Sequence, residues 1–333
     1  MRLASLRDGS PDGRLAVVAP DGVHAALATG IAATLQDALE RWDAVEPALR
    51  RLAAAIDAGD PVVALVAIGA AQLGAPLPRA WQWLDGSAFP QHGVLMQQAF
   101  GLPPIATDRP LMYQGLSDRF LGPHDDVALP SEEDGIDFEG EFGVIVDAVP
   151  MGITADAARA HIRLVVQIND WSLRTIAPIE MKTGFGWIQA KPACSAAPFA
   201  VTPGALGDAW RDGRVHATLE TRINGALFGA VPGGAEMAFG FHDLVAHAAR
   251  TRALVAGTII GSGTVSSADY ARVGSSCLSE RRAIDIIAGR TPTSFLRFGD
   301  RIAMRAIVAD RVPFGVLSQV VTKNGAWSGE HEG

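Results

Sequence analysis

The stretch that most constrains the fold is an alternating run of apolar and acidic residues at 136–146, with the sequence Ile-Asp-Phe-Glu-Gly-Glu-Phe-Gly-Val-Ile-Val. With a period of two, one side carries Phe138, Gly140, Phe142, Val144 and Val146, and the other carries Asp137, Glu139 and Glu141. The alternation predicts a half-buried β-strand with its acids on one face. Acids this close together repel one another unless they are solvated, protonated or bridged by a cation. An exposed strand face with ordinary surface acids is the alternative.

The composition allows a large buried core and disfavours several classes of partner. The chain has 333 residues, of which 48% are hydrophobic and 19% charged, which suits one large domain with a smaller appendage or two domains. Its formal net charge is -8 and its basic residues form no long run. Nucleic acid and anionic membrane surfaces are therefore poor candidates as partners.

Cysteine usage and the first residues indicate a cytoplasmic protein. Cys194 and Cys277 are the only cysteines, and neither lies in a Cys-x-x-Cys spacing. A reduced compartment fits this pattern better than a disulfide framework or a thiolate metal site. Residues 1–13 contain no apolar signal region. The longest uncharged run, 61–78, falls short of the roughly 20 apolar residues of a membrane helix, and we expect a buried strand followed by a loop there.

Two units are expected, with a boundary near the Gly-Ala-Pro-Leu-Pro segment at 74–78. Residues 1–75 are expected to form a small α+β domain, with a strand at 15–18 and helical spacing from Ile31 to Trp42 that Pro47 interrupts. Residues 76–325 are expected to form the catalytic domain, and 326–333 a polar tail. In the larger unit, short apolar runs separated by turns predict a mixed α+β, β-rich fold of the rolled or barrel-like type.

Local patterns in the larger unit predict several elements. Asn224-Gly225 lies between two strand-like runs and predicts a type I′ hairpin. Apolar residues at 241, 244, 245, 248 and 249 predict an amphipathic helix. A short helix is expected at 155–162, followed by a buried strand at 164–168.

Four acids stand out as candidate ligands for a divalent cation: Asp85, Glu139, Glu141 and Asp170. Asp170 follows an apolar strand-like run, and the two glutamates belong to the alternating stretch. A donor set made only of oxygen suits Mg²⁺ best, with Ca²⁺ or Mn²⁺ possible in its place, and does not suit zinc or copper. Acids at strand ends are also common without any metal.

These motifs together resemble the fumarylacetoacetate hydrolase family. Asp137-Phe138-Glu139-Gly140-Glu141 is similar to the family's carboxylate–x–carboxylate strand, and Asn169-Asp170-Trp171-Ser172-Leu173-Arg174 to the segment that follows it in the family. The resemblance covers most of residues 80–320. It implies a β-roll catalytic domain, a homodimer, and Asp85, Glu139, Glu141 and Asp170 as metal ligands.

Further matches resemble the fumarylacetoacetase-like subgroup. The resemblance implies His92 as the catalytic histidine, Arg174 and Lys191 as catalytic cations, and Tyr113 and Thr264 as substrate-binding residues. The chain departs from the subgroup at four positions: Ser87, Gly101, Ala177 and Leu278. Leu278 stands where the subgroup has its catalytic glutamate. Glu280, two residues further on, would lie on the same face of a strand and so could replace it.

The resemblance implies a metal-dependent hydrolase that cleaves a C–C bond in a β-diketo acid such as a fumarylacetoacetate or an acylpyruvate. His92 would be the general base for water, because the imidazole titrates near neutral pH. Two alternatives stay open: a 2-keto-alkenoate hydratase, decarboxylase or tautomerase of the same fold, and a non-catalytic small-molecule binding protein.

Each candidate also has an ordinary structural interpretation. His92 could cap the helix-like run at 94–99, and Lys191 could be a solvated loop lysine. Arg174 could pair with Glu180 on the surface, and Tyr113 could be a core aromatic residue.

Overall fold

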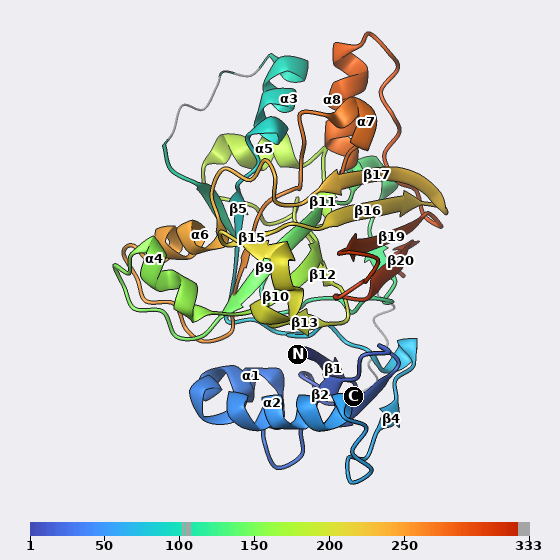
Figure 1. The fold of residues 1–333 in the computed structure, drawn as a ribbon. Coiled ribbons are helices and arrows are strands. Elements are labelled where there is room, and N and C mark those ends of the chain that lie inside the picture. Colours follow the sequence, from blue (N-terminus) through green and yellow to red (C-terminus); the bar gives the residue numbers. More distant parts are fainter. Residues whose placement is uncertain (102, 104–107, 326–333) are drawn as a thin grey trace, which may run out of the picture.

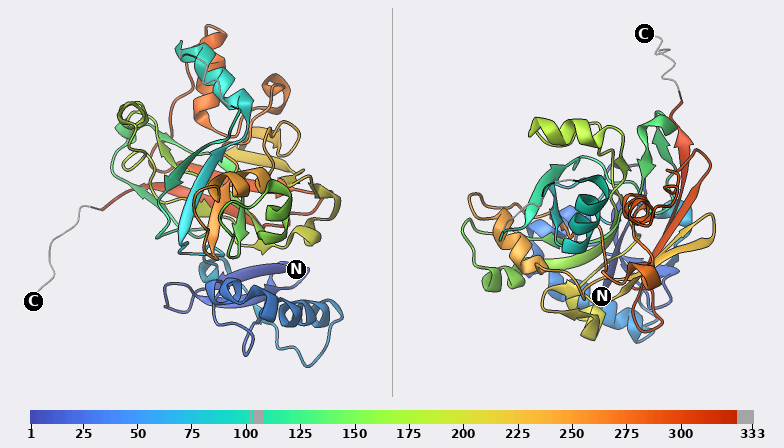
Figure 2. Two further views of the ribbon diagram at one scale, coloured as in Figure 1. Left: turned by 90° about the vertical axis from the view of Figure 1, so that its left-hand side faces the viewer. Right: turned by 90° about the horizontal axis from the view of Figure 1, so that it is seen from above.

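A computed structural model describes residues 1–101, 103 and 108–325, so the predicted polar tail at 326–333 lies outside the described residues. Within these residues the chain forms an 11-stranded sheet, a five-stranded sheet and two short strand pairs, with helices around them. Figures 1 and 2 show α1 and α2 at one end of the molecule and α3, α7 and α8 at the opposite end. The fold is the mixed, β-rich class predicted from the sequence.

The large sheet combines strands from both ends of the chain. In order across the sheet, its strands are β4 (Val66–Ala67), β3 (His24–Leu27), β2 (Arg14–Val18), β1 (Arg2–Leu6), β13 (Ala200–Val201), β10 (Ile162–Asn169), β9 (Gly140–Val146), β18 (Thr258–Gly261), β5 (Gln82–Ser87) and β6 (Leu111–Gly115), with β12 (Ser195–Ala196) also paired to β10. In the described part of the chain the edges β4 and β6 do not pair, so the sheet is open and not a closed barrel.

The second sheet lies beside the first and is built mostly from the last third of the chain. Its order is β17 (Ala226–Pro232), β16 (Thr218–Ile223), β19 (Arg301–Ile307), β20 (Val316–Lys323) and β7 (Val127–Leu129). The short pairs are β8 (Ile136–Asp137) with β11 (Ser172–Leu173), and β14 (Trp210–Arg211) with β15 (Arg214–Val215).

The helices are short except for α2. They are α1 (Leu35–Glu40), α2 (Trp42–Asp57), α3 (Pro90–Phe100), α4 (Ala155–Ala158), α5 (Ala177–Thr183), α6 (Phe241–Ala248), α7 (Tyr270–Val273) and α8 (Leu278–Ile287). Four 3-10 helices are η1 (Ala70–Gln72), η2 (Glu132–Asp134), η3 (Arg159–His161) and η4 (Pro203–Ala209). Among the described residues, none of these helices is both long enough and apolar enough to cross a bilayer.

Several local predictions are confirmed. Asn224 and Gly225 both adopt positive φ, at 51° and 83°, as a type I′ turn requires, and they join β16 to β17. The amphipathic pattern at 241–249 forms α6, whose Leu244 and Val245 are buried. The buried strand predicted at 164–168 is the central part of β10.

The N-terminal elements share a core with the strands that carry the acids. Leu35, Leu39 and Leu49 from α1 and α2 belong to the same buried cluster as Ile145 of β9 and Leu164 of β10. Two predictions in this region are wrong. Pro47 lies inside α2 and the break falls at Arg41; the proline removes one backbone hydrogen bond, and burial of the apolar face of the helix, including Leu49, offsets that loss. The run at 61–78 contains the short, exposed strand β4 and the 3-10 helix η1, and not a buried strand.

The alternating stretch is more deeply buried than predicted. It forms β8, a break at Phe138 and Glu139, and then β9, all of which is buried. Phe142 and Val144 pack into one core and Ile145 into the other, because β9 lies between β10 and β18 in the middle of the sheet. The prediction of a half-buried strand is therefore wrong, and the glutamates of this stretch lie in the interior of the protein.

Candidate metal and catalytic site

Three of the four predicted metal ligands meet at one end of the large sheet. Asp85 lies in β5, Glu141 in β9, and Asp170 directly after β10. Strand pairing aligns them, since Gly261 of β18 lies opposite both Asp85 and Gly143. Carboxylate oxygens from the three acids lie within 4.8 Å of one another.

Glu139, the fourth predicted ligand, is close to this group but engages cations. Lys191 Nζ lies 3.0 Å from its Oε2 atom, and Arg174 Nη2 donates to its Oε1 atom. Its backbone N–H donates to Asn169 Oδ1 at 3.0 Å, which fixes the chain at the break between β8 and β9. Glu139 therefore connects the carboxylate group to the two cations.

Asp170 is held by three side chains. Lys191 Nζ lies 2.6 Å from Oδ2, the Tyr113 hydroxyl donates to the same oxygen at 2.5 Å, and the Cys194 thiol donates to Oδ1 at 3.0 Å. Tyr113 is thus not a core aromatic, since its hydroxyl reaches the site and its ring contacts Trp187 edge-on.

Burial and mutual repulsion shape the protonation of the group. Burial, and then repulsion from Asp170, raises the pKa of Asp85 well above its usual range. Burial, and then repulsion from Asp85, does the same for the pKa of Glu141. Burial also acts to raise the pKa of Glu139, but Lys191 and Arg174 outweigh it and lower that pKa below its usual range. The site thus contains one stable carboxylate and two that resist ionisation without a further positive charge.

The residues present fit a hard divalent cation. Five buried carboxyl groups face only two cationic side chains, the acids being Asp85, Asp137, Glu139, Glu141 and Asp170 and the cations Arg174 and Lys191. Among the described residues, no N–H or hydroxyl group donates to either carboxylate oxygen of Glu141, which is fully buried and meets the carboxyl group of Asp85. A buried, unpartnered carboxylate is costly unless a cation or a proton compensates it. The oxygens of Asp85, Glu141 and Asp170 are the donors that Mg²⁺ or Mn²⁺ would use.

His92 and Glu280 form a second group next to these acids. His92 Nδ1 lies 3.0 Å from Glu280 Oε1, and the Ser275 hydroxyl lies 2.9 Å from Glu280 Oε2. The group borders the carboxylates, since Glu139 pairs with Cys277 in an isolated β-bridge and His92 contributes to the lowered pKa of Glu139. The structure therefore brings the histidine, its acid partner and the carboxylates into one region.

Glu280 meets His92 for a different reason from the one predicted. Residues 278–287 form the helix α8, so the argument from a shared strand face is wrong. Glu280 lies in the first turn of α8, and α3, which carries His92, packs against this helix through Leu95 and Ala283. Helix packing brings the two side chains together over a separation of 188 residues.

The two predicted catalytic cations both form ion pairs with buried acids of the protein. Lys191 Nζ contacts Glu139, Asp170 and the Ser172 hydroxyl, which uses all three ammonium hydrogens. Arg174 bridges Asp137 and Glu139 and does not pair with Glu180. Both cations therefore hold acids in place.

The predicted substrate-binding residue Thr264 lies in the loop after β18. On one side of it, the N–H of Gly263 donates to Asp85 Oδ1 at 3.0 Å, and on the other the N–H of Val265 donates to the Gly140 carbonyl. Gly263 has a φ of 73°, and a Cβ there would lie 2.4 Å from the Gly86 carbonyl oxygen. This glycine is needed for the loop to approach Asp85 so closely.

The sequence did not point to two residues that organise the site. Asp137 accepts the N–H groups of Leu278 and Ser279 at 2.7 and 2.9 Å, so it fixes the N-terminus of α8 as well as Arg174. Cys194 donates its thiol to Asp170 from the segment before β12. Recognising that 278–287 is a helix would have indicated an acid near its N-terminus; the sequence carries no comparable signal for Cys194.

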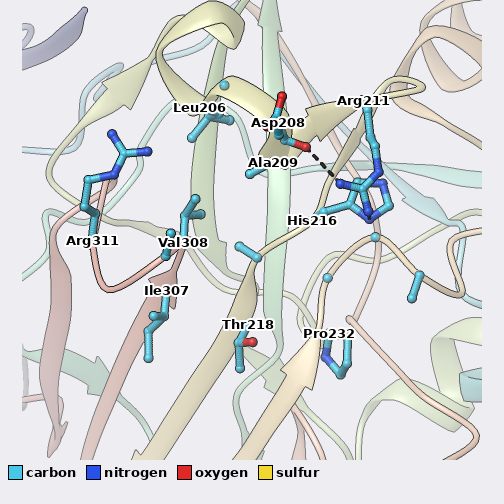
Figure 3. A pocket seen from close by; sticks show the side chains of 16 residues that line it. Leu206, Asp208, Ala209, Arg211, His216, Thr218, Pro232, Ile307, Val308 and Arg311 are labelled. Carbon is cyan, nitrogen blue, oxygen red and sulfur yellow. Dashed lines mark hydrogen bonds between the residues drawn. The ribbon is translucent and has the colours of Figure 1, made fainter.

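A separate cavity of about 700 Å³ lies between η4 and the ends of β16, β17 and β19 (Figure 3). Arg211 Nη2 lies 3.0 Å from His216 Nδ1 there, and burial together with Arg211 and Arg214 lowers the pKa of His216. None of the candidate metal ligands or catalytic residues lines this cavity.

Comparison with curated proteins gives partial matches. A 2,4-didehydro-3-deoxy-L-rhamnonate hydrolase from Sphingomonas sp. (strain SKA58) is 31% identical over 108 residues, which cover 32% of this chain and 36% of that protein. A mitochondrial oxaloacetate tautomerase from Homo sapiens is 26% identical over 165 residues, which cover 46% of this chain and 48% of that protein. In both cases the chain spans less than half the length of the relative.

Solved structures match over nearly the whole chain. Maleylpyruvate hydrolase from Sphingobium sp. SYK-6, in complex with manganese(II) ion and pyruvate, has a TM-score of 0.65 at 19% identity, covering 98% of this chain and 100% of that one. Fumarylacetoacetate hydrolase from Exiguobacterium antarcticum has a TM-score of 0.66 at 18% identity, covering 97% and 100%. At these identities the likeness establishes the fold alone.

Family models cover both parts of the chain. One described as the fumarylacetoacetate (FAA) hydrolase C-terminal domain matches residues 82–322, and one described as fumarylacetoacetase N-terminal domain 2 matches residues 1–79. The first alone covers most of the sequence and contains every candidate site residue. This protein is therefore a member of the fumarylacetoacetate hydrolase family, as the sequence motifs predict.

Proposed function

We propose that this chain is a divalent-metal-dependent hydrolase of the fumarylacetoacetase-like subgroup, cleaving a C–C bond in a β-diketo acid. One observation carries the proposal: a buried carboxylate group with an unpartnered glutamate lies beside a histidine–glutamate pair. A metal alone would serve a hydratase or tautomerase equally well. The adjoining base is what hydrolysis requires, because water must be deprotonated to attack a carbonyl.

Asp85, Glu141 and Asp170 would hold the metal, with Glu139 beside them, and Mg²⁺ is the ion we expect. When bound, the ion would act as a Lewis acid toward the substrate oxygens. Lys191 and Arg174 lower the pKa of Glu139 and hold it in place, and Lys191 also holds Asp170. These two cations therefore act as positioning residues.

His92 would act as the general base. Glu280 accepts a hydrogen bond from Nδ1–H in the tautomer that leaves the Nε2 lone pair free. Nε2 can then take a proton from water, and the Glu280 carboxylate stabilises the imidazolium that results. The Ser275 hydroxyl supports the second oxygen of Glu280, so the pair is held on both sides.

The test is an assay of purified protein against a panel of acylpyruvates and fumarylacetoacetate-like acids, following the enol absorbance with Mg²⁺ and with EDTA. Metal-dependent loss of absorbance, with two carbonyl fragments as products, is the expected result. A protein that binds the metal but leaves every diketo acid intact would contradict the proposal.

A tautomerase, hydratase or decarboxylase reaction on a keto acid is the second candidate. The partial match to an oxaloacetate tautomerase favours it, and so do Ala177 and Leu278, where the subgroup carries a glutamine and a glutamate. Product analysis separates the two, since an isomerised or hydrated product or released CO₂ would replace the paired carbonyl fragments.

A homodimer and a cytoplasmic location remain predictions. Four apolar side chains in and after α5 are exposed, namely Ile179, Met181, Phe185 and Ile188. Exposed apolar groups of this kind are typical of protein interfaces. Light scattering on the purified protein would measure the oligomeric state, and a monomer at micromolar concentration would contradict the dimer.

A further inference from the structure

A second group of metal-ligating side chains lies where α3 meets α8, outside the carboxylate site. A ring nitrogen of His92, the sulfur of Cys277 and a carboxylate oxygen of Glu280 all lie within 4.8 Å of one another. The cysteine spacing in the sequence argues against a thiolate metal site. Folding nevertheless places Cys277, at the start of α8, beside Glu280 of the same helix and beside His92 of α3, which is far away in the sequence.

These three residues are carried on packed elements. Cys277 is the N-cap of α8, its sulfur accepting the Glu280 N–H at 3.3 Å, and Glu280 lies in the first turn. His92 lies near the start of α3, which packs on α8. Cys277 and Glu280 are buried, whereas the His92 side chain is 22% exposed. An ion could therefore enter from the histidine side and find the ligands already in place.

The donor chemistry of this group differs from that of the carboxylate site. One nitrogen, one sulfur and one oxygen suit Zn²⁺, Cd²⁺ or Co²⁺, which bind thiolate and imidazole in tetrahedral sites with a solvent ligand in the fourth position. Mg²⁺ prefers oxygen ligands and does not compete for a thiolate. The two adjacent groups of side chains therefore differ in the metal ions that their donor atoms suit.

The geometry points to an inhibitory site for a thiophilic divalent cation, held by His92 Nδ1, Cys277 Sγ and Glu280 Oε1. On binding, the ion takes the place of the proton between His92 and Glu280, the imidazole takes up one proton from solvent on Nε2 in exchange for the one lost from Nδ1, and the thiol proton is released to solvent. An imidazole ligated through Nδ1 carries its proton on Nε2. Nε2 then has no lone pair to accept a proton from water, so the base is lost without any redox change.

The inhibitory effect depends on the proposed function, but the binding does not. Binding can be measured by titrating the Mg²⁺-saturated protein with Co²⁺ and recording the thiolate-to-cobalt charge-transfer absorbance. We expect one equivalent of Co²⁺ to produce this band in the wild type. Cys277→Ser should abolish the band and keep the helix cap, because serine is a good N-cap residue.

Cys194→Ser is the matched control, since it removes the only other cysteine and leaves a hydroxyl that can still donate to Asp170. It should retain the band in full. Absence of the band from the wild type, or its loss in Cys194→Ser and not in Cys277→Ser, would overturn the proposal.

A second variant keeps the test decisive if Cys277→Ser does not fold. His92→Ala should weaken retention of Cd²⁺ in equilibrium dialysis by at least about 10-fold, since even indirect partners of metal ligands are worth 10–100-fold in affinity. Unchanged retention would overturn the assignment of the ligands.

Zn²⁺ in the diketo-acid assay then tests the inhibition. Micromolar Zn²⁺ should inhibit the Mg²⁺-loaded wild type and leave the turnover of Cys277→Ser unaffected. A charge-transfer band without any diketo-acid turnover would refute the proposed function and support the site. Turnover that Zn²⁺ does not inhibit, despite the band, would overturn the inhibitory role.

Discussion

Replacing Glu141 by glutamine should have opposite effects on stability with and without metal. The glutamate is fully buried, no donor in the described structure reaches its oxygens, and burial and Asp85 raise its pKa. In EDTA, Glu141→Gln removes this uncompensated group, and the unfolding free energy should rise by roughly 1–3 kcal/mol, the cost typical of an unsatisfied buried group. For a chain of 333 residues, that is an increase in Tm of about 1–4 °C.

With metal the order should reverse. At a metal concentration 100 times the wild-type Kd, binding stabilises the wild type by about 2.7 kcal/mol, or about 4 °C in Tm. If losing this ligand weakens binding about 100-fold, the variant gains only about 0.4 kcal/mol at the same concentration. The metal-induced shift should therefore nearly vanish in Glu141→Gln.

Differential scanning fluorimetry in EDTA and in Mg²⁺ or Mn²⁺ measures both effects. Glu133→Gln, at an exposed acid shortly before the same stretch, should match the wild type in both conditions. A Glu141→Gln variant that is less stable than the wild type in EDTA, or that keeps the full metal-induced shift, would refute the assignment of Glu141 as an uncompensated metal ligand.

Three further predictions follow from the same site. His92→Ala should lower kcat by on the order of 10²–10⁴ while leaving the metal-induced shift in Tm intact, and a lost shift would contradict its role as base. Lys191→Met should destabilise the fold by about 3–5 kcal/mol in urea unfolding, because it leaves Asp170 buried without a cation and leaves Glu139 with Arg174 alone; the exposed Lys182→Met is the control. Because folding raises the pKa of Glu141, this group costs the wild type no stability below the unfolded pKa of about 4.3. As the pH rises from there toward the folded pKa, the free energy of unfolding of the wild type falls. In EDTA, the excess in Tm of Glu141→Gln over the wild type should therefore widen as the pH rises above about 5, and a constant excess would argue against this protonation.

Elements set by neighbouring residues could be predicted from the sequence. Asn224-Gly225 tolerates positive φ at both positions, so the hairpin follows from the residue types alone. The spacing of apolar residues predicts α6 in the same way. The burial of a strand could not be predicted in this way, because it depends on which other elements pack against the strand. Contrary to prediction, β4 is exposed and β9 is fully buried.

The sequence determined the chemical identity of the site: which acids, which histidine and which cations are available, and on which side of its strand Glu141 lies. The tertiary structure decided which of these side chains contact one another. It assigned Glu139 to Lys191 and Arg174, left Glu141 without a donor, and brought Glu280 to His92 by packing α8 on α3. The reason is that residue spacing encodes direction only within one helix or strand. Contacts between residues on different elements, here 35 to 188 positions apart, depend on how those elements pack, which no local pattern records.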